Sequence, residues 1–268
     1  GFISGYRGSP LGGFDQQLWR AKKFLDRHNI VFKPGINEDL GATAVWGSQQ
    51  VNLYPGAKFD GVFGMWYGKA PGVDRTGDVF KHANAAGTSR HGGVLAIAGD
   101  DHACKSSTLP SQSEFAFMDA EIPVLNPAGI QEVLDFGLYG WAMSRFSGTW
   151  TAMIALAENM DASATVDVAP DRVQIRMPQN FAMPVGGLSI RLGDTPADQE
   201  RRLREHKLDA AIAFAHENVL NRVVLDSPNA RIGLVASGKS YLDLRQALVD
   251  LGIGNKEVAE LGLRIFKV

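Results

Sequence analysis

The short apolar run at residues 93–98 constrains the fold of this chain more than any other feature. It reads Gly93-Val94-Leu95-Ala96-Ile97-Ala98 and is bounded by glycine and by Asp100. A strand without polar alternation is typical of the centre of a parallel sheet that is covered on both faces. Helices must then alternate with strands along the chain. The run therefore predicts an α/β protein.

The rest of the first half follows that alternation. The spacing of Phe14, Leu18, Ala21 and Leu25 predicts a helix with one apolar face. Further elements are predicted as a helix over about 38–54, a strand over 59–66, a helix over about 74–87, a strand over 122–125, a helix over 130–142 and a strand over 150–156. The order implies a parallel sheet with helices on both faces.

Three loops of this sheet are candidates for a ligand site. In open parallel sheets, ligands bind beyond the carboxyl ends of the strands. The loops that follow Ser4, Trp66 and Ala98 are the ones expected at that edge.

A second α/β unit is predicted after a linker. Residues 159–193 lose helical periodicity and carry several prolines. A long helix is then predicted to begin at Thr195 and Pro196. Its expected buried face is formed by Leu208, Ile212, Ala215 and Val219. A strand over 232–236, a helix over 242–251 and an alternating strand over 263–268 follow. The predicted domains are residues 1–185 and residues 186–268, the second being a linker helix and a truncated α/β domain.

Composition excludes several classes of function. The 27 basic and 29 acidic residues give a net charge of −2, so bulk charge gives no reason to bind nucleic acid or an anionic membrane. No apolar run reaches the roughly 18–20 residues that span a bilayer. The single cysteine, Cys104, excludes a disulfide framework and a cysteine-rich zinc or iron–sulfur site within this chain. A cytoplasmic protein is expected. Because both ends read as strands and residue 1 is not Met, the chain is expected to be a fragment.

The loop after the first strand is rich in glycine. It reads Tyr6-Arg7-Gly8-Ser9-Pro10-Leu11-Gly12-Gly13. Glycines before a helix let the backbone approach an anionic ligand. The loop matches neither the dinucleotide fingerprint nor a P-loop, so spacing alone favours a plain tight turn.

Glu38 opens the second predicted helix. Asn37, Glu38 and Asp39 together suit a helix cap and the helix dipole. The following residues, Leu40 to Val45, are small and apolar, which indicates a buried helix. A carboxyl group at a buried helix start needs a partner, or its pKa rises, and such a group could exchange a proton with a ligand.

Two further loops carry polar or aromatic side chains. Residues 65–72 suit either a platform over a flat ligand or a packed loop. Residues 99–107 contain Asp100, Asp101, His102 and Cys104, but their spacing fits no zinc pattern, so no metal site is predicted. A Cys104 nucleophile with His102 is also disfavoured, because such partners normally come from distant segments. A polar substrate loop is the favoured interpretation.

The residue patterns of these loops resemble those of one enzyme family. Residues 5–13 resemble the opening loop of the 2-oxoacid:ferredoxin oxidoreductases, and Ile36-Asn37-Glu38 resembles that family's next helix start. Residues 66–75 and 99–107 are similar to the long, fused bacterial indolepyruvate ferredoxin oxidoreductases. The resemblance implies a pyrimidine-type thiamine diphosphate-binding domain over residues 1–180 and a transketolase-C-terminal-like domain from about residue 195.

The resemblance also implies roles for particular residues. Glu38 would be the catalytic glutamate that hydrogen-bonds the aminopyrimidine and so favours removal of the thiazolium C2 proton. The implied cofactor-binding residues are Arg7, Gly8, Ser9, Pro10, Trp66, Tyr67, Gly68 and Lys69. Weaker candidates for the substrate side are Asp101, His102, Lys105 and Ser106.

The implied reaction is oxidative decarboxylation of an aryl 2-oxoacid such as indolepyruvate. Coenzyme A would receive the acyl group, and electrons would pass through [4Fe-4S] clusters to ferredoxin. The segment that holds the diphosphate and Mg²⁺ is absent from this chain, as are the cysteine clusters. The chain is therefore expected to be inactive alone and to need further domains, within a homodimer. Two alternatives stay open: a non-oxidative thiamine-dependent 2-oxoacid decarboxylase, and a noncatalytic α/β interaction module.

Overall fold

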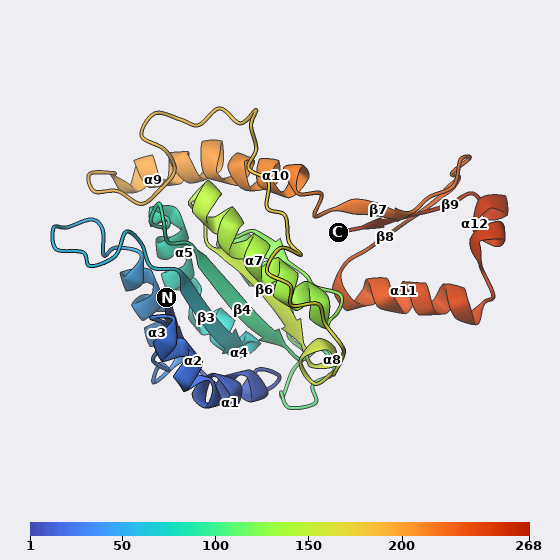
Figure 1. The fold of residues 1–268 in the computed structure, drawn as a ribbon, viewed down its shortest axis with the longest axis horizontal. Coiled ribbons are helices and arrows are strands. Elements are labelled where there is room, and N and C mark those ends of the chain that lie inside the picture. Colours follow the sequence, from blue (N-terminus) through green and yellow to red (C-terminus); the bar gives the residue numbers. More distant parts are fainter.

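The computed structural model describes all 268 residues and contains two sheets (Figure 1). The larger sheet has six strands in the order β2-β1-β3-β4-β6-β5, and every neighbouring pair is parallel. Its strands are β1 (Phe2–Gly5), β2 (Val31–Phe32), β3 (Gly64–Lys69), β4 (Val94–Asp100), β5 (Val124–Leu125) and β6 (Thr151–Leu156). All seven residues of β4 are buried, so the predicted central strand is confirmed.

Helices cover both faces of this sheet, as predicted. Its helices are α1 (Gly12–Arg20), α2 (Lys22–Arg27), α3 (Glu38–Ser48), α4 (Ala70–Arg75), α5 (Gly77–Ala86), α6 (Glu114–Asp119), α7 (Ile130–Ser147) and α8 (Ala157–Met160). Val94, Ala96 and Ala98 of β4 pack in a core with α3, α4, α5 and α6. Leu95 and Ile97 point the other way, into a core with α1 and α7. The period of two along the strand thus divides the interior into two layers.

Several element boundaries differ from the predictions, three of them near the candidate site. The helix expected over 38–54 ends at Ser48, and the helix expected over 74–87 is divided between α4 and α5. The strand expected over 59–66 begins only at Gly64 and continues to Lys69. The loop expected after Trp66 is therefore strand, and α4 begins directly at Ala70.

A long helical segment crosses the first domain (Figure 1). It consists of α9 (Pro196–Arg202), a π-helical turn (Leu203–Lys207) and α10 (Leu208–Glu217). The predicted start is confirmed, since the Thr195 hydroxyl accepts a hydrogen bond from the Asp198 backbone N–H. The predicted buried face is wrong: Ile212 and Val219 are exposed, while Lys207 and Phe214 are buried.

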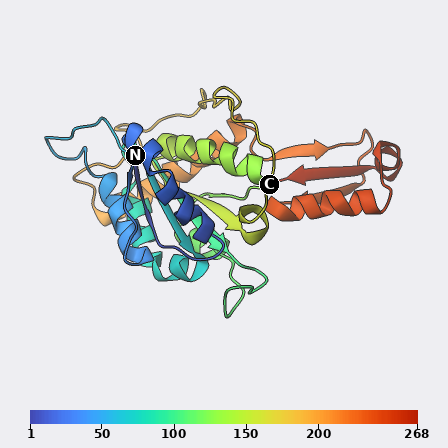
Figure 2. The same ribbon diagram turned by 60° about the horizontal axis from the view of Figure 1, so that its bottom comes forward.

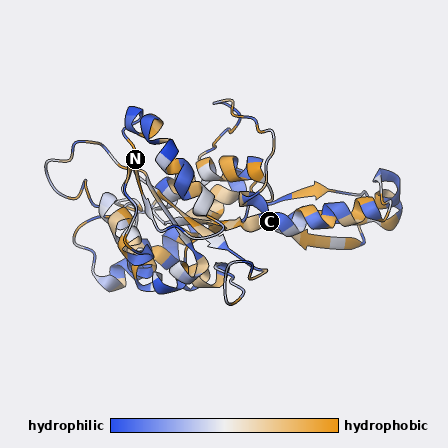
Figure 3. Ribbon diagram, turned by 90° about the horizontal axis from the view of Figure 1, so that it is seen from below, coloured by the Kyte–Doolittle hydropathy of each residue, from blue (hydrophilic) through white to orange (hydrophobic).

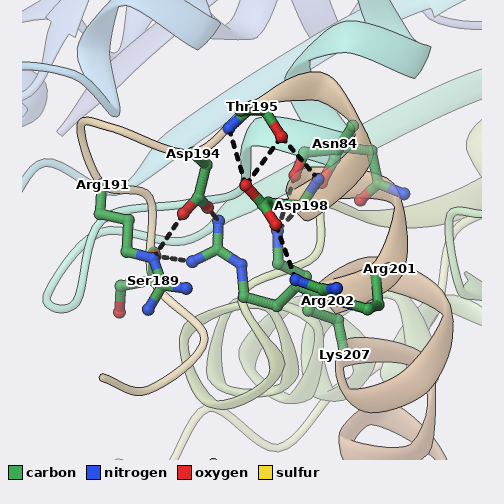
Figure 4. A network of polar contacts seen from close by, with 10 residues as sticks. Asn84, Ser189, Arg191, Asp194, Thr195, Asp198, Arg201, Arg202 and Lys207 are labelled. Atoms are coloured by element: carbon green, nitrogen blue, oxygen red, sulfur yellow. Dashed lines mark hydrogen bonds and ion pairs between the residues drawn. The ribbon is translucent and has the colours of Figure 1, made fainter. Parts of the chain in front are cut away.

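The contacts of Lys207 explain why the buried face of this helix differs from the predicted one. Its ammonium group donates hydrogen bonds to the carbonyl oxygens of Asn84 (3.4 Å) and Ala85 (3.0 Å), at the end of α5 (Figure 4). Arg202, one turn earlier, forms an ion pair with Asp194. Burial lowers the pKa of Lys207 to about 7. A polar contact to α5 thus decides which side of the long helix faces inward.

Residues 222–268 form a second, smaller unit that extends away from the first (Figure 2). Its three strands lie in the order β7-β9-β8, with β8 and β9 parallel and β7 and β9 antiparallel. The elements are β7 (Arg222–Leu225), β8 (Ile232–Ala236), α11 (Gly238–Asp250), α12 (Asn255–Leu261) and β9 (Leu263–Lys267). The predicted strands at 232–236 and 263–268 are confirmed, whereas β7 was not predicted.

Hydropathy follows these layers. In Figure 3 the central strands are mainly pale to orange, and many helical turns toward the outside are blue. None of the helices combines the length and the apolar character that crossing a bilayer would require.

Candidate functional site

The loops after β1 and β4 and the junction between β3 and α4 meet at the carboxyl ends of these strands. A Cβ atom on Gly8 would lie 3.0 Å from the Cβ of Lys69. A Cβ atom on Gly99 would lie 3.0 Å from Pro10 Cδ and from Leu11 Cγ. The sheet therefore brings together the three loops that the alternating pattern pointed to.

Glu38 is the first residue of α3, and its carboxyl group is sheltered. The helix begins with Asn37, whose side chain accepts a hydrogen bond from the Leu40 N–H at 2.9 Å. The Trp66 indole N–H donates to the Glu38 backbone carbonyl at 3.0 Å. The Glu38 side chain is 13% exposed. The predicted shielding of this carboxyl group is confirmed, and its chemical role stays a prediction.

The side chain of Glu38 lies against the backbone of Gly72. A Cβ atom on Gly72 would come 2.2 Å from Glu38 Cγ and 2.6 Å from its Cδ and Oε1. A Cβ atom on Gly68 would come 3.3 Å from the same Cγ. Because real Cβ contacts are not this short, glycine at position 72 is what admits the carboxyl group.

Arg75 is the cation nearest to Glu38, and the sequence analysis did not identify it. Its Nε donates to Asp39 at 2.9 Å, while its NH1 lies 3.8 Å from Glu38 Oε2. The Arg75 side chain is 52% exposed, so this ion pair is weak. The chain itself forms no hydrogen bond to the Glu38 carboxylate, which leaves both oxygens free to accept one.

Of the two interpretations left open for Trp66 and Tyr67, a platform for a ligand or a packed segment, packing is the one observed. Both side chains are completely buried, on opposite faces of β3. The Tyr67 hydroxyl donates to Asp15 at 2.6 Å, and burial raises the pKa of Tyr67 above its ordinary value. Neither ring has a face for a cofactor. Gly68 is buried as well and serves the close approach of Glu38.

The first loop offers a mixture of exposed and buried residues. Arg7 and Ser9 are exposed and form no hydrogen bond within the chain, and Gly8 is half-buried beside Lys69. Pro10 is buried against Gly99, so it has almost no surface for a cofactor and supports the loop instead.

A polar cavity of about 520 Å³ lies between the start of α4 and the loop after β4. It is lined by Lys69, Ala70, Pro71, Asp74 and residues 106–113. The Lys69 ammonium donates to Ser106 O (2.8 Å) and Ser106 Oγ (3.1 Å), which joins two of the predicted residues. A larger cavity, of about 810 Å³, lies at the opposite, amino ends of β1 and β2, away from Glu38.

Asp101 organises the loop after β4. Its carboxylate accepts hydrogen bonds from the backbone N–H groups of Lys105 (3.0 Å) and Ser106 (2.7 Å). These bonds, above all the one from Ser106, hold the pKa of Asp101 below its ordinary value. The Asp101 oxygens are used within the loop, so this residue supports the loop, and its contact with substrate stays a prediction. Lys105 is exposed.

Asp100, the last residue of β4, forms a separate cluster. It accepts hydrogen bonds from the Ser113 N–H (2.8 Å) and hydroxyl (2.5 Å), and His102 Nε2 lies 4.0 Å away. Glu114 completes a group whose ligand atoms lie within 4.8 Å of one another. Burial raises the pKa of both Asp100 and Glu114. Glu114 could not be found by local spacing, because it lies fourteen residues beyond Asp100 and is brought back by the loop.

Comparison with known proteins points to one family. Residues 222–268 match the model of the indolepyruvate oxidoreductase domain. The indolepyruvate oxidoreductase subunit IorA of Pyrococcus abyssi is 25% identical over 210 residues, which are 77% of this chain and 32% of that protein. The corresponding subunit of Methanothermobacter marburgensis is 24% identical over 259 residues, which are 94% of this chain and 38% of that protein. The chain thus spans about a third of the length of these relatives.

A solved structure shares the fold. The 2-oxoglutarate:ferredoxin oxidoreductase of Magnetococcus marinus, determined with 2-oxoglutarate, coenzyme A and succinyl-CoA bound, matches with a TM-score of 0.66. The match covers all of this chain and 50% of that one, at 15% sequence identity. Together, the domain match over residues 222–268 and the IorA relatives over most of the chain show that this chain is similar to indolepyruvate oxidoreductase subunits, and the solved structure shows that it shares their kind of α/β fold.

Proposed function

We propose that this chain supplies the aminopyrimidine side of a thiamine diphosphate site in an indolepyruvate:ferredoxin oxidoreductase. The observation that carries the proposal is the Glu38 carboxyl group, which is 13% exposed, lies against Gly72 and forms no hydrogen bond within the chain. It stands at the carboxyl edge of a parallel sheet, where such sheets bind ligands. The match of residues 222–268 to the indolepyruvate oxidoreductase domain and the similarity to IorA subunits support this chemistry over other uses of a sheltered glutamate.

The residues present fit such a cofactor. Glu38 would hold a proton between its carboxyl group and a ring nitrogen, and the cradle of Gly68 and Gly72 fixes its side chain. The exposed loop with Arg7 and Ser9 would line the same side of the site. When bound, thiamine diphosphate supplies the electron sink for decarboxylation of a 2-oxoacid.

Lys69 and Ser106 suit the substrate side. Their polar groups border the cavity of about 520 Å³ that opens beside the start of α4. An ammonium group at this position would attract the carboxylate of a 2-oxoacid and orient it. His102, which is 47% exposed, lies on the same loop as Ser106.

The rest of the proposed enzyme would come from outside this chain. The chain spans 32–38% of the length of its IorA relatives, and its single cysteine provides no set of iron–sulfur ligands. We propose that further domains hold the diphosphate with Mg²⁺ and the [4Fe-4S] clusters, and that coenzyme A and ferredoxin bind there. A cytoplasmic homodimer, the domain division near residue 185 and the aryl 2-oxoacid as substrate are parts of the same proposal.

The test is hydrogen–deuterium exchange at C2 of thiamine diphosphate bound to the full-length protein. Glu38→Gln keeps the volume of the side chain and removes its ability to exchange a proton. Exchange slowed at least tenfold, with cofactor still bound, is the expected result. Asp78→Asn, at an exposed acidic position of α5, is the control and should leave exchange unchanged. Unchanged exchange in the Glu38 variant would refute the proposal.

Assays of the same full-length protein distinguish the two alternative functions from the proposed one. A non-oxidative decarboxylase would release an aldehyde without reducing ferredoxin, whereas the proposed enzyme would reduce it. A noncatalytic module would fail to bind thiamine diphosphate in the presence of Mg²⁺.

A further inference from the structure

Three side chains with metal-ligating atoms gather beyond the end of β4. Asp100 is the last residue of the strand, His102 lies in the following loop, and Glu114 begins α6. One potential ligand atom of each residue lies within 4.8 Å of the other two. The three come from different segments of backbone, so the loop between β4 and α6 is what brings them together.

One oxygen of this cluster lacks a partner. Asp100 is completely buried and is satisfied by Ser113, whereas Glu114 Oε2 is buried without any hydrogen bond. The other Glu114 oxygen receives only a long contact, 3.4 Å, from the Asn126 amide. Burying a carboxylate oxygen without a partner costs free energy, so this oxygen is directed at an interaction that the chain alone does not provide.

The charges of the cluster favour a cation. Asp100 and Glu114 are neighbouring carboxyl groups, and the charge of Asp74 also acts on Asp100. Like charges at this separation repel one another in a partly buried site. A cation between them would relieve the repulsion and satisfy Glu114 Oε2 at the same time.

The kinds of ligand atom narrow the choice of cation. Ca²⁺ and Mg²⁺ prefer oxygen alone, whereas an imidazole nitrogen with two carboxylate oxygens suits Zn²⁺ or Mn²⁺. Bonds of about 2.0–2.2 Å require the three ligand atoms to draw closer than they are here. His102 can supply that movement, because it is 47% exposed and lies in a loop.

The cluster reaches solvent through His102, which is 47% exposed, whereas Asp100 is completely buried. Ser113 and Asp74 both line the polar cavity of about 520 Å³, and both act on Asp100. A cation held by three protein ligands would keep an open position for water.

We propose that Asp100, His102 and Glu114 form a binding site for one divalent transition-metal cation of the Zn²⁺ or Mn²⁺ kind. The site is distinct from the Mg²⁺ of the proposed cofactor, which would be held by other domains. It requires neither Glu38 nor thiamine diphosphate.

The experiment is equilibrium dialysis of the full-length, chelator-treated protein against Zn²⁺, with excess Mg²⁺ and with metal analysis of both compartments. Wild-type protein is compared with Glu114→Gln, which keeps the side-chain volume, and with His102→Ala, which changes an exposed loop residue and so does not endanger folding. Each variant is expected to bind one equivalent of Zn²⁺ per chain at least tenfold more weakly than wild type. The result should be the same with and without thiamine diphosphate.

His82→Ala is the matched control. His82 Nε2 lies 3.5 Å from Asp78 in an exposed pair that has no third ligand. Its removal should leave Zn²⁺ binding unchanged. Equal binding by wild type and His102→Ala would overturn the proposal, as would an equal loss in His82→Ala. Because the readout is bound metal, its failure would leave the proposed role of Glu38 untouched.

Discussion

The carboxyl group of Glu38 occupies the space that a side chain at position 72 would need: a Cβ atom on Gly72 would lie 2.2 Å from Glu38 Cγ. The first residue of α3 and the first turn of α4 therefore pack closely at the contact between the Glu38 side chain and the Gly72 backbone. The position of the proposed catalytic group depends on this contact as well as on its own helix.

A methyl group at position 72 should displace Glu38. Gly72→Ala is expected to slow C2 exchange of the bound cofactor at least tenfold, because the carboxyl group must move by more than the tolerance of a catalytic hydrogen bond. Exchange at C2 measures this directly in the full-length protein.

Gly77→Ala is the control for that substitution. Gly77 begins α5, and a Cβ atom there meets nothing within 4 Å. Exchange in this variant should match that of wild type. Equal rates in the Gly72 and Gly77 variants would mean that the position of Glu38 does not matter to the reaction.

The indole N–H of Trp66 should stabilise the start of α3. Trp66→Phe keeps most of the buried apolar surface but removes the donor to the Glu38 carbonyl oxygen, which lies 3.0 Å away. The free energy of unfolding should fall by about 1–3 kcal/mol, measured by urea denaturation of the full-length protein. Trp19→Phe, at a side chain that is 55% exposed, should change it little. Equal losses in the two variants would contradict the assigned hydrogen bond.

Stability should depend on pH through Lys207. Burial lowers its pKa to about 7 in the folded chain, below the ordinary value of 10.5, so the folded state binds fewer protons than the unfolded state between these values. The free energy of unfolding of wild type, minus that of Lys207→Met, should therefore increase as the pH rises from 7 to about 10. The slope should not exceed about 1.4 kcal/mol per pH unit. A difference that stays flat over this range would show that Lys207 keeps an ordinary pKa.

Lys267 should fasten the second unit to the first. Its ammonium group is 2% exposed, pairs with Glu132 of α7 and lies 5.2 Å from the Tyr241 ring. Glu132 also pairs with Arg222 at 3.9 Å, so removal of Lys267 deletes one of the two ion pairs that Glu132 forms with the second unit. In Lys267→Ala, backbone amides of β7, β8 and β9 should exchange faster with D₂O.

The control for this variant is Lys256→Ala. Lys256 is 80% exposed and pairs with Glu260 at 3.8 Å within the same unit. Its removal should leave amide exchange unchanged. If the two lysine variants behave alike, Lys267 does not hold the units together.

The sequence predicted the architecture well where one physical effect dominated. Residues 94–98 are apolar without interruption and are followed by a polar loop, so β4 and the candidate edge of the sheet could be identified. The start of α3 was equally clear, because Asn37 is a strong N-cap residue followed by small apolar residues.

Other features depend on tertiary contacts that local patterns do not record. The glycines that follow Trp66 made this part of the chain look like a loop, although Gly68 serves close packing inside β3. Lys207 reads as a surface residue until its contact with the end of α5 is seen, and this contact turns the helix. Glu114 lies close to Asp100 only because the thirteen-residue loop from residue 101 to 113 folds back toward the end of β4.

The most direct test of the account is the position of the cofactor relative to Glu38. It requires the structure of the full-length protein with thiamine diphosphate and Mg²⁺ bound, and the distance from the Glu38 carboxylate to the nearest ring nitrogen of the aminopyrimidine. The account predicts a hydrogen bond of about 2.6–3.2 Å. A cofactor bound elsewhere, with Glu38 facing only solvent or Arg75, would contradict it.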